Sequence, residues 1–304
     1  MPASDRSFML APMSAQPRPS EPFDYCQAKA AASGSSFYYA FRFLPEARRR
    51  AIVALYAFCR EVDDVVDECS DAGVARLKLQ WWRDELQRTF AGTPQHPVGR
   101  ALAEQIRIYN LPQEYFLEII DGMEMDLDRH RYAAFKDLAL YCYRVAGVVG
   151  LLSAEIFGYS NRQTLKYATR LGTAFQLTNI LRDVGEDARR GRIYIPVEDM
   201  RRFGVNEQDI LSCQHTPRIE RLLAHQLERA RQHYRDALAL LPPEDRPAQR
   251  AGLIMAEIYQ ATLDEIERDG LRVLERRVAL TPLRKLWIAW RTARRESRAV
   301  PADG

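Results

Sequence analysis

The sequence lacks most of the features that would place it in a specialised structural class. Its five cysteines are odd in number and scattered, which indicates buried thiols in a reducing compartment rather than a disulfide framework or a metal cage. It has no run of eighteen apolar residues, so no membrane-spanning segment is predicted. A net charge of +3 and the lack of zinc-finger or RNA-binding spacing give no reason to expect a nucleic-acid partner.

The sequence also lacks convincing alternation of apolar and polar residues, so strands are not predicted. Apolar residues recur three and four positions apart, which predicts one all-α domain at 23–296 between disordered tails at 1–22 and 297–304. The segment RRGRIYIPVEDM (189–200) is predicted to be a loop that closes over another part of the molecule. Predicted helices cover 24–32, 46–69, 71–91, 97–109, 112–129, 134–157, 161–188, 217–241, 246–269 and 277–295.

What the sequence does contain is an unusual concentration of acids in an otherwise apolar helix. The stretch YAFCREVDDVVDE (56–68) follows the apolar run AIVALYAF, although Asp is a poor helix former and like charges four apart repel. Four of its residues share one helical face, because they are spaced four, three and four apart: Tyr56, Arg60, Asp63 and Asp67.

A second helix repeats this pattern. In LGTAFQLTNILRDVGEDARRGRIYIP (171–196), spacings of three, four and four align Gln176, Asn179, Asp183 and Asp187. Arg182, Glu186 and Arg190 are predicted to form i, i+4 ion pairs on a different face. A single face of this kind is usually solvated, but two in apolar helices favour Mg²⁺ and a diphosphate, since Mg²⁺ binds carboxylates together with phosphate oxygens. Arg60 is placed to contact the same phosphates.

These motifs resemble those of the squalene and phytoene synthase family of head-to-head prenyl transferases. The resemblance extends from about residue 24 to residue 290 and includes SGSSFYYAFRFLP, LYAFCREVDDVVDE, DGMEMDL, YCYRVAGVVGLL and TAFQLTNILRDVGEDARRGRIYIP. Within the family, SSFYYAFRFLP, EYFLEIIDGMEMDL and RVAGVVGLLSAEIFGY are most similar to bacterial presqualene diphosphate synthases of hopanoid biosynthesis. The resemblance implies a single-domain isoprenoid-synthase helical bundle around a central cavity.

The same resemblance implies a Mg²⁺-dependent condensation of two farnesyl diphosphates to presqualene diphosphate, with release of diphosphate. It assigns catalysis to Arg60, Tyr141, Asp63 and Asp183, and metal binding to Asp63, Asp67, Asn179, Asp183 and Asp187. Tyr141 is expected to orient the departing diphosphate or to assist loss of the proton, for which the diphosphate is the other candidate base. Substrate contacts are assigned to Ser35, Ser36, Phe37, Tyr56, Arg60, Val145, Gly150, Gln176, Asn179, Tyr259 and Arg277.

Three further stretches have competing interpretations. VAGVVGLLSAEIFG fits an apolar cavity wall, and its small residues Gly147, Gly150 and Ala154 equally fit close helix packing. The acids of DGMEMDLDRHRY are expected to be structural rather than metal ligands. Trp81 and Trp82 are expected in the core.

Alternative functions are a phytoene synthase acting on two geranylgeranyl diphosphates, a full squalene synthase using NADPH, and a non-catalytic helical interaction protein of the same fold. No GxGxxG dinucleotide fingerprint is present. The expected location is the cytoplasm, with peripheral contact at the inner membrane, and the expected partner besides substrate is a downstream squalene-forming enzyme.

The candidate membrane contact is the C-terminal stretch LRKLWIAWRTARRESR (283–298). Leu283, Leu286, Trp287 and Trp290 recur at helical spacing among many basic residues, which is typical of an interfacial helix. The alternative is a last helix that packs on the core and leaves its basic side solvated.

Overall fold

Helices form all the regular structure in the part of the chain that the computed structural model describes, residues 22–32 and 36–298. An isolated bridge joins Arg131 to Ile193, and no strand forms among these residues, so the all-α prediction is confirmed. Most of the predicted tails at 1–22 and 297–304, like Ser35, lies outside the described residues, but Pro22 and residues 297–298 are helical, so both tails were predicted slightly too long. The longer helices are α1 (Pro22–Ala32), α3 (Glu46–Glu68), α4 (Ala72–Phe90), α5 (Pro97–Tyr109), α6 (Gln113–Asp128), α7 (Phe135–Cys142), α8 (Val148–Phe157), α9 (Gln163–Arg189), α12 (Pro217–Ala239), α13 (Arg250–Arg268) and α14 (Pro282–Arg298).

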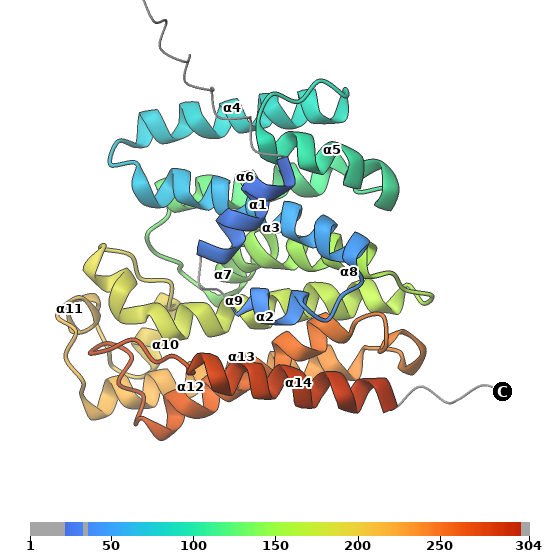
Figure 1. Cartoon of the computed structure of the whole chain (residues 1–304). Coiled ribbons are helices and arrows are strands. Elements are labelled where there is room, and N and C mark those ends of the chain that lie inside the picture. The colour runs from blue at the N-terminus through green and yellow to red at the C-terminus, as the bar shows by residue number, and fades with distance from the viewer. Residues whose placement is uncertain (1–21, 33–35, 299–304) are drawn as a thin grey trace, which may run out of the picture.

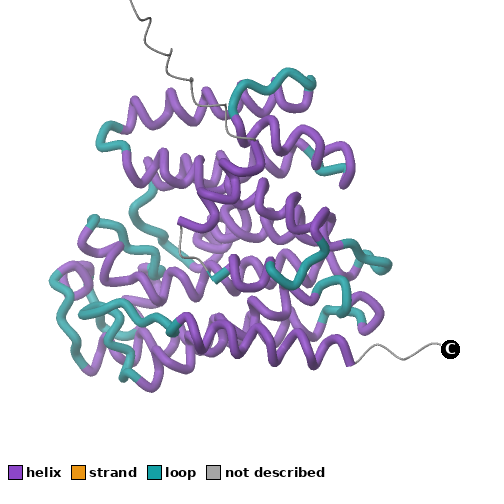
Figure 2. The backbone as a smooth tube through the Cα atoms, in the orientation of Figure 1, coloured by secondary structure: helices purple, strands orange, loops and turns teal. Residues whose placement is uncertain are grey.

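The helices are stacked in layers, with α4 and α5 at one end and α12, α13 and α14 at the other (Figure 1). α9 packs against α8, α12 and α13, whereas α3 packs against α1, α5 and α6. Figure 2 shows the loops joining successive helices. The two helices that carry the predicted acidic faces, α3 and α9, therefore lie in the middle of the stack.

Helix ends follow local sequence signals. α5 begins with Pro97 in its first turn, after His96 accepts a hydrogen bond from the Val98 amide, and it ends where Asn110 adopts a left-handed conformation with φ of 50°. α12 begins in the same way, with the Thr216 side chain as its N-cap followed by a proline. These caps fix the lengths of the outer helices around α3 and α9.

Glycines bring α8 and α9 into close contact. A Cβ atom built on Gly150 would lie 2.3 Å from the Ala168 carbonyl oxygen, and one on Gly172 would lie 2.3 Å from the Ala146 carbonyl oxygen. No side chain larger than hydrogen fits at either position without moving backbone. Close helix packing is therefore the main role of Gly150, although this residue also borders the central cavity.

The predicted continuous helix at 134–157 is instead two α-helices joined by a π-helical turn, η1 (Tyr143–Gly147). Apolar periodicity does not distinguish such a turn from an α-helical one. The π-helical turn shifts the spacing of the apolar residues by about one position, and three- and four-residue spacings already alternate in a regular α-helix. With its flanking helices this segment, Phe135–Phe157, is long and apolar enough to cross a membrane by composition, with a mean hydropathy of 1.4. It packs against α6 and α9, and a buried core helix passes the same test.

Three short helices were not predicted, because five or six residues are too few to show a period: α2 (Phe37–Phe41), α10 (Val197–Arg202) and α11 (Glu207–Leu211). The predicted loop at 189–200 therefore ends in helix. The helix predicted at 246–269 begins only at Arg250, after a 3₁₀ turn, η2 (Pro243–Asp245).

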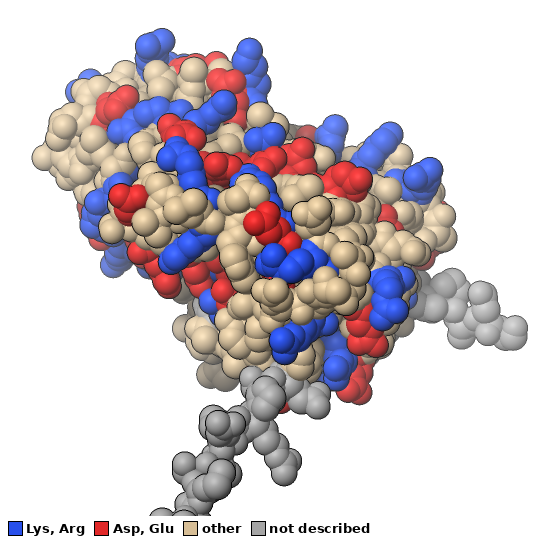
Figure 3. Space-filling model, turned by 90° about the horizontal axis from the view of Figure 1, so that it is seen from above, with Lys and Arg blue, Asp and Glu red and all other residues tan. Residues whose placement is uncertain are grey.

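The expectation that both tryptophans of α4 pack in the core is wrong for one of them. Trp82 is 5% exposed, but Trp81 is 40% exposed. Adjacent residues on a helix point about 100° apart, so a helix on the outside of the stack cannot bury both. Over the face seen in Figure 3, basic and acidic side chains are interspersed.

Candidate active site

A cavity of about 610 Å³ lies between α3, α8, α9 and α13. Apolar side chains form much of its wall, among them Ile52, Leu55, Phe157, Leu171 and Met255. Most of the residues predicted to touch substrate border this one cavity. They are Ser36, Phe37, Tyr56, Arg60, Asp63, Tyr141, Val145, Gly150, Gln176, Asn179, Tyr259 and Arg277.

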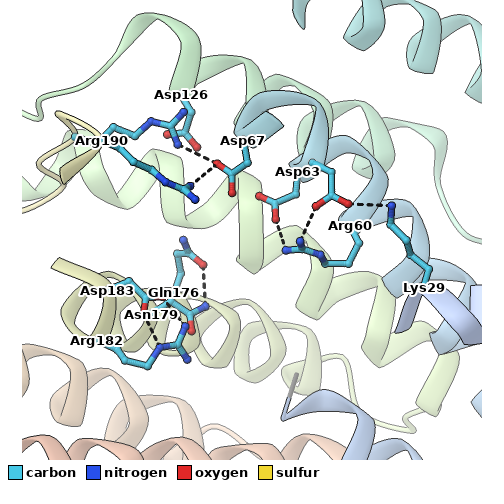
Figure 4. A network of polar contacts seen from close by, with 12 residues as sticks. Lys29, Arg60, Asp63, Asp67, Asp126, Gln176, Asn179, Arg182, Asp183 and Arg190 are labelled. Carbon is cyan, nitrogen blue, oxygen red and sulfur yellow. Dashed lines mark hydrogen bonds and ion pairs between the residues drawn. The ribbon is translucent and has the colours of Figure 1, made fainter. Parts of the chain in front are cut away.

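The first acidic face lies on α3 and points toward α9 (Figure 4). The Arg60 guanidinium donates to Asp63 at 2.5 Å and to Asp64 at 2.6 Å. Lys29 of α1 forms a second ion pair with Asp64 at 2.9 Å, which leaves Asp64 on the side away from the cavity. Asp64 is therefore held by two cations and does not line the cavity.

Asp67, one turn further along α3, is paired with the loop that the sequence predicts to close over another part of the molecule. Arg192 donates to the Asp67 carboxylate at 3.1 Å, and Arg190 lies 3.3 Å from the same oxygen. The loop therefore closes over the end of the first acidic face. The contact also corrects the predicted pairing of Arg190 with Glu186, since Arg190 turns across to α3 instead.

The second acidic face lies on α9. Arg182 donates two hydrogen bonds to the Asp183 carboxylate, at 2.8 and 2.6 Å, and Arg277 donates to it at 2.8 Å. The predicted Arg182–Glu186 pair is wrong, because Arg182 borders the cavity and pairs with the carboxylate beside it. Glu186 lies 3.8 Å from Arg277 instead.

Three cations lie within electrostatic reach of one another at the cavity, and two of them, Arg182 and Arg277, are paired with Asp183. Arg182, Arg277 and Lys285 all border the cavity, and Lys285 comes from the first turn of α14. Burial lowers the pKa of Lys285, and the positive charges of Arg182 and Arg277 lower it further. Cations this close repel one another unless an anion joins them, so the cluster is suited to a multiply charged anion such as diphosphate.

Two amides of the second face also reach the cavity. Asn179 donates to the Gln176 side chain at 3.3 Å, while the Asn179 side-chain oxygen is buried and has no hydrogen-bond partner among the described residues. A buried acceptor without a partner costs about 1–3 kcal/mol. This oxygen is therefore available to a ligand on the cavity side of α9.

Partly buried carboxylates lie on both acidic faces. Burial raises the pKa of Asp63 to about 6, and Asp67, Asp64 and Asp126 raise it against the opposing effect of Arg60. Burial also raises the pKa of Asp187 to about 7, with Asp183 as the next cause and Asp126 contributing. Asp126 thus acts on acids of both helices, which places the two faces within electrostatic reach of each other.

Asp126 itself anchors a buried tyrosine pair. Tyr141 and Tyr194 each donate a hydrogen bond to its carboxylate at 2.8 Å, and their rings stack with centroids 5.2 Å apart. Burial raises the pKa of Asp126 to about 6, while the two hydroxyls lower it. The expectation that this acid of DGMEMDLDRHRY is structural agrees with these contacts.

Aromatic rings cover one part of the cavity. Phe37 contacts Tyr56 and Tyr259, with ring centroids 5.7 and 6.3 Å apart, so three residues assigned from distant motifs meet here. Phe175 of α9 completes the group, 4.8 Å from the Tyr259 ring. Sequence reasoning missed Phe175, although it directly precedes Gln176 of the second face.

Further residues at the site were also missed. Arg182 was assigned to a solvated ion pair and Lys285 to the basic surface of the last helix. Arg192 and Tyr194 lie in the RRGRIYIPVEDM loop, and the prediction that this loop closes over another part of the molecule was the only sequence signal for them. Their contacts with α3 and α6 join residues more than sixty positions apart, which helical periodicity does not report.

The donor atoms present fit Mg²⁺. No group of three or more His, Cys, Asp or Glu side chains in the described part of the chain is close enough to hold a metal ion alone. Mg²⁺ is typically bound by one or two carboxylates with phosphate oxygens and water completing the shell, so such a group is not required. The available donors are all oxygen, and the unpartnered oxygen of Asn179 is one of them.

Comparison with known proteins agrees with this geometry. The squalene/phytoene synthase family model matches residues 30–284. A 15-cis-phytoene synthase of Synechocystis sp. is 38% identical over 285 residues, covering 89% of this chain and 85% of that protein. Phytoene synthase 3 of Zea mays is 36% identical over 290 residues, covering 92% and 67%.

Among solved structures, a dehydrosqualene synthase superposes with a TM-score of 0.79 at 30% identity, covering 91% of this chain and 97% of that one. The squalene synthase HpnC from Alicyclobacillus acidocaldarius superposes with a TM-score of 0.73 at 32% identity, covering 82% and 94%. Asp63 of the first acidic motif and Asn179 of the second border the cavity, whereas Asp67, Asp183 and Asp187 lie beyond its lining. With a family model that matches most of its length, the chain belongs to the squalene/phytoene synthase family of prenyl transferases.

Proposed function

We propose that the protein condenses two farnesyl diphosphates head to head into presqualene diphosphate and inorganic diphosphate, a step toward squalene and hopanoids. In this reaction the allylic C1–O bond of one substrate breaks, and its C1 joins C2 and C3 of the other. One proton leaves as the cyclopropane closes. The observation that carries the proposal is the pair of opposed faces of acids and arginines at an apolar cavity.

The charged residues bind and orient the two diphosphates. Arg60 approaches from α3, and Arg182, Arg277 and Lys285 approach from the opposite side. Negative charge develops on the leaving group as the C1–O bond lengthens, so these cations stabilise the transition state more than the ground state. Mg²⁺, held by oxygens of Asp63, Asp67, Asn179, Asp183 and Asp187, would supply further positive charge to the phosphate oxygens.

The aromatic and apolar wall protects the carbocation. Phe37, Tyr56, Phe175 and Tyr259 border the cavity, and the face of an aromatic ring attracts a cation without bonding to it. The rest of the wall excludes water, which would otherwise capture the cation.

The released diphosphate is the better proton acceptor. Burial raises the pKa of Tyr141 well above its usual value, so the phenol stays protonated while it donates to Asp126. We therefore assign Tyr141 to positioning at the cavity wall and the proton to a diphosphate oxygen.

Two observations support farnesyl diphosphate as substrate. The stretches SSFYYAFRFLP, EYFLEIIDGMEMDL and RVAGVVGLLSAEIFGY are similar to presqualene diphosphate synthases. The solved structures at 30% and 32% identity are a dehydrosqualene synthase and a squalene synthase.

The second candidate is phytoene synthesis from two geranylgeranyl diphosphates, and the curated relatives favour it over the farnesyl assignment. Phytoene synthases of cyanobacteria are 37–38% identical to this chain, more than either solved structure above. Both candidates use the same site and differ in the length of cavity that the prenyl chains need.

Product identification tests these assignments. The purified protein would be incubated with Mg²⁺ and either farnesyl or geranylgeranyl diphosphate, with and without NADPH, and the products separated by mass. Presqualene diphosphate formed from the C15 substrate with no reductant supports the proposal. Phytoene formed preferentially from the C20 substrate would establish the second candidate, and squalene formed only with NADPH would show a full squalene synthase. No product from either substrate would indicate a non-catalytic protein.

A further inference from the structure

The outward face of α14 is apolar and exposed. Leu283 is 79% exposed, Trp287 54% and Trp290 50%, and Leu286 lies beside them. The helix is attached to the core by the opposite face, which consists of Ile288, Ala289, Thr292, Ala293 and Glu296. The alternative interpretation, in which the Leu and Trp side packs on the core, is therefore wrong, because the opposite side of the helix forms that contact.

Basic residues lie directly on the exposed tryptophans. The Arg291 guanidinium is 4.6 Å from the centre of the Trp287 ring, and that of Arg294 is 4.9 Å from the Trp290 ring. Arg295 is paired with Glu257 at 2.9 Å and with Glu296 at 3.0 Å, and Arg291 lies 3.6 Å from the same Glu257, whereas no ion pair of Arg294 is found among the described residues. The outward face of α14 thus combines two large aromatic rings, two leucines and two arginines.

We propose that this face docks the protein on an anionic lipid bilayer. Tryptophan rings with a polar edge and an apolar body are suited to the boundary between headgroups and acyl chains. Arginines on the same rings would meet lipid phosphates, whereas a protein partner would have to supply a carboxylate to each of them as water is removed. Charge complementarity therefore favours an anionic lipid surface over a second copy of this chain.

The first turn of α14 borders the cavity, so a membrane contact through this helix would bear on substrate access. Lys285 in its first turn and residues 278–280 just before it border the cavity, as do Ser36 and Phe37 beside α2. α2 packs against α14 and carries the exposed Tyr38. A bilayer on this face would lie next to the cavity rim, where lipid-soluble prenyl substrates could pass between the two. That consequence rests on the proposed function, but the docking itself does not.

A matched control surface exists at the opposite end of the stack. α4 carries Val74, Leu77 and Trp81, which are exposed and spaced three and four apart. α4 and α14 lie at opposite ends of the molecule (Figure 1). Substitutions there remove similar apolar surface without touching the proposed docking face.

The test is sedimentation of the full-length protein with vesicles. One set contains phosphatidylcholine alone and another contains added phosphatidylglycerol, each at about 0.05 M and about 0.5 M salt. Variants are Trp287→Ala with Trp290→Ala, Arg291→Glu with Arg294→Glu, and the control Leu77→Ala with Trp81→Ala. Thermal melts confirm that each variant is folded, and sedimentation velocity without vesicles reports self-association.

We expect the wild type and the α4 control to bind the anionic vesicles at low salt. The partition coefficient of both α14 variants onto these vesicles should be lower than that of the wild type by about tenfold or more. High salt should reduce wild-type binding by a similar factor. The proposal is overturned if the wild type does not bind, if the tryptophan variant binds like the wild type, or if the α4 variant loses binding equally. A wild-type dimer that the tryptophan substitutions dissociate, together with no vesicle binding, would assign the face to a second copy instead.

Discussion

The two acidic faces differ in how their charges are compensated. On α3, Asp63 is paired with Arg60 of the same helix, and Asp67 with Arg190 and Arg192 of the 189–200 loop. On α9, Asp183 has arginine partners, whereas Asp187 forms no ion pair in the described part of the chain and has its pKa raised to about 7. The Asn179 oxygen on the same face is also without a partner there.

This difference indicates that the two faces differ in how much negative charge is left for a bound cation to compensate. Asp67 of α3 is already paired with two arginines, so losing it frees cations that can still bind diphosphate. The α9 face has oxygens that protein cations leave uncompensated. We therefore predict that binding of Mg²⁺, the proposed cofactor, depends more on α9 than on α3.

The largest expected effect comes from removing one carboxylate in the centre of either face. Asp63→Asn or Asp183→Asn should reduce turnover about a hundredfold or more, because the leaving group loses several kcal/mol of stabilisation. Steady-state rates at saturating Mg²⁺ measure this. Asp128→Asn, which removes an exposed acid paired with Arg76, is the control and should remain near the wild-type rate.

Mg²⁺ dependence sharpens the comparison. Asp187→Asn should raise the Mg²⁺ concentration for half-maximal rate roughly tenfold, and Asp67→Asn only about threefold, because arginines already compensate Asp67. Titrating Mg²⁺ at fixed substrate gives both values. Equal shifts, or a larger shift for the α3 variant, would show that arginine pairing does not distinguish the faces.

Substitution of the two tyrosines that donate hydrogen bonds to Asp126 tests whether this carboxylate couples the two acidic faces. Tyr141→Phe and Tyr194→Phe each remove one hydrogen bond to that carboxylate, worth about 1 kcal/mol. Tyr141 also borders the cavity, so its loss should lower kcat about tenfold, against roughly threefold for Tyr194. Identical rates for the two variants would mean that Tyr141 acts only through Asp126.

The smallest expected effect on turnover is at the packing between α8 and α9. Gly150→Ala forces Cβ toward the Ala168 carbonyl and should cost about 1–3 kcal/mol of stability, lowering Tm by several degrees. The rate well below Tm should change by less than about twofold. Gly147→Ala, whose Cβ meets its nearest side chain at 3.2 Å, is the milder control. An unchanged Tm with a raised KM would indicate instead that Gly150 mainly leaves space for substrate in the cavity.

Helical periodicity predicted which residues share a face of one helix, but not which side chains of different segments form pairs. The spacing of Gln176, Asn179 and Asp183 placed them on one face because an α-helix repeats every 3.6 residues. Arg60 and Arg182 are local partners of Asp63 and Asp183, but other arginine partners of the two faces come from 94 and 125 positions away, as with Arg277 to Asp183 and Arg192 to Asp67. Such pairs depend on tertiary packing, which no local pattern encodes.

Local rules also failed where burial changed the preferred partner. The i, i+4 rule assumes solvated side chains, and it paired Arg182 with Glu186. Arg182 is instead largely buried at the cavity, where the carboxylate of the adjacent Asp183 is its partner. Core packing of the tryptophans in the last helix was not observed either, because the side with Ile288, Ala289 and Ala293 fits against the core instead.

The π-helical turn at Tyr143–Gly147 keeps a straight row of side chains along the cavity. Tyr141, Val145, Val149, Ser153 and Phe157 all border it, each four residues after the last. In a regular α-helix such a row rotates by about 40° at every step and would leave the cavity within a few turns. The wider turn rotates less per residue and cancels part of this drift. A single-residue deletion there would turn Val149, Ser153 and Phe157 by about 100° relative to Tyr141. The number of residues in this turn therefore determines which side chains of α8 face the cavity.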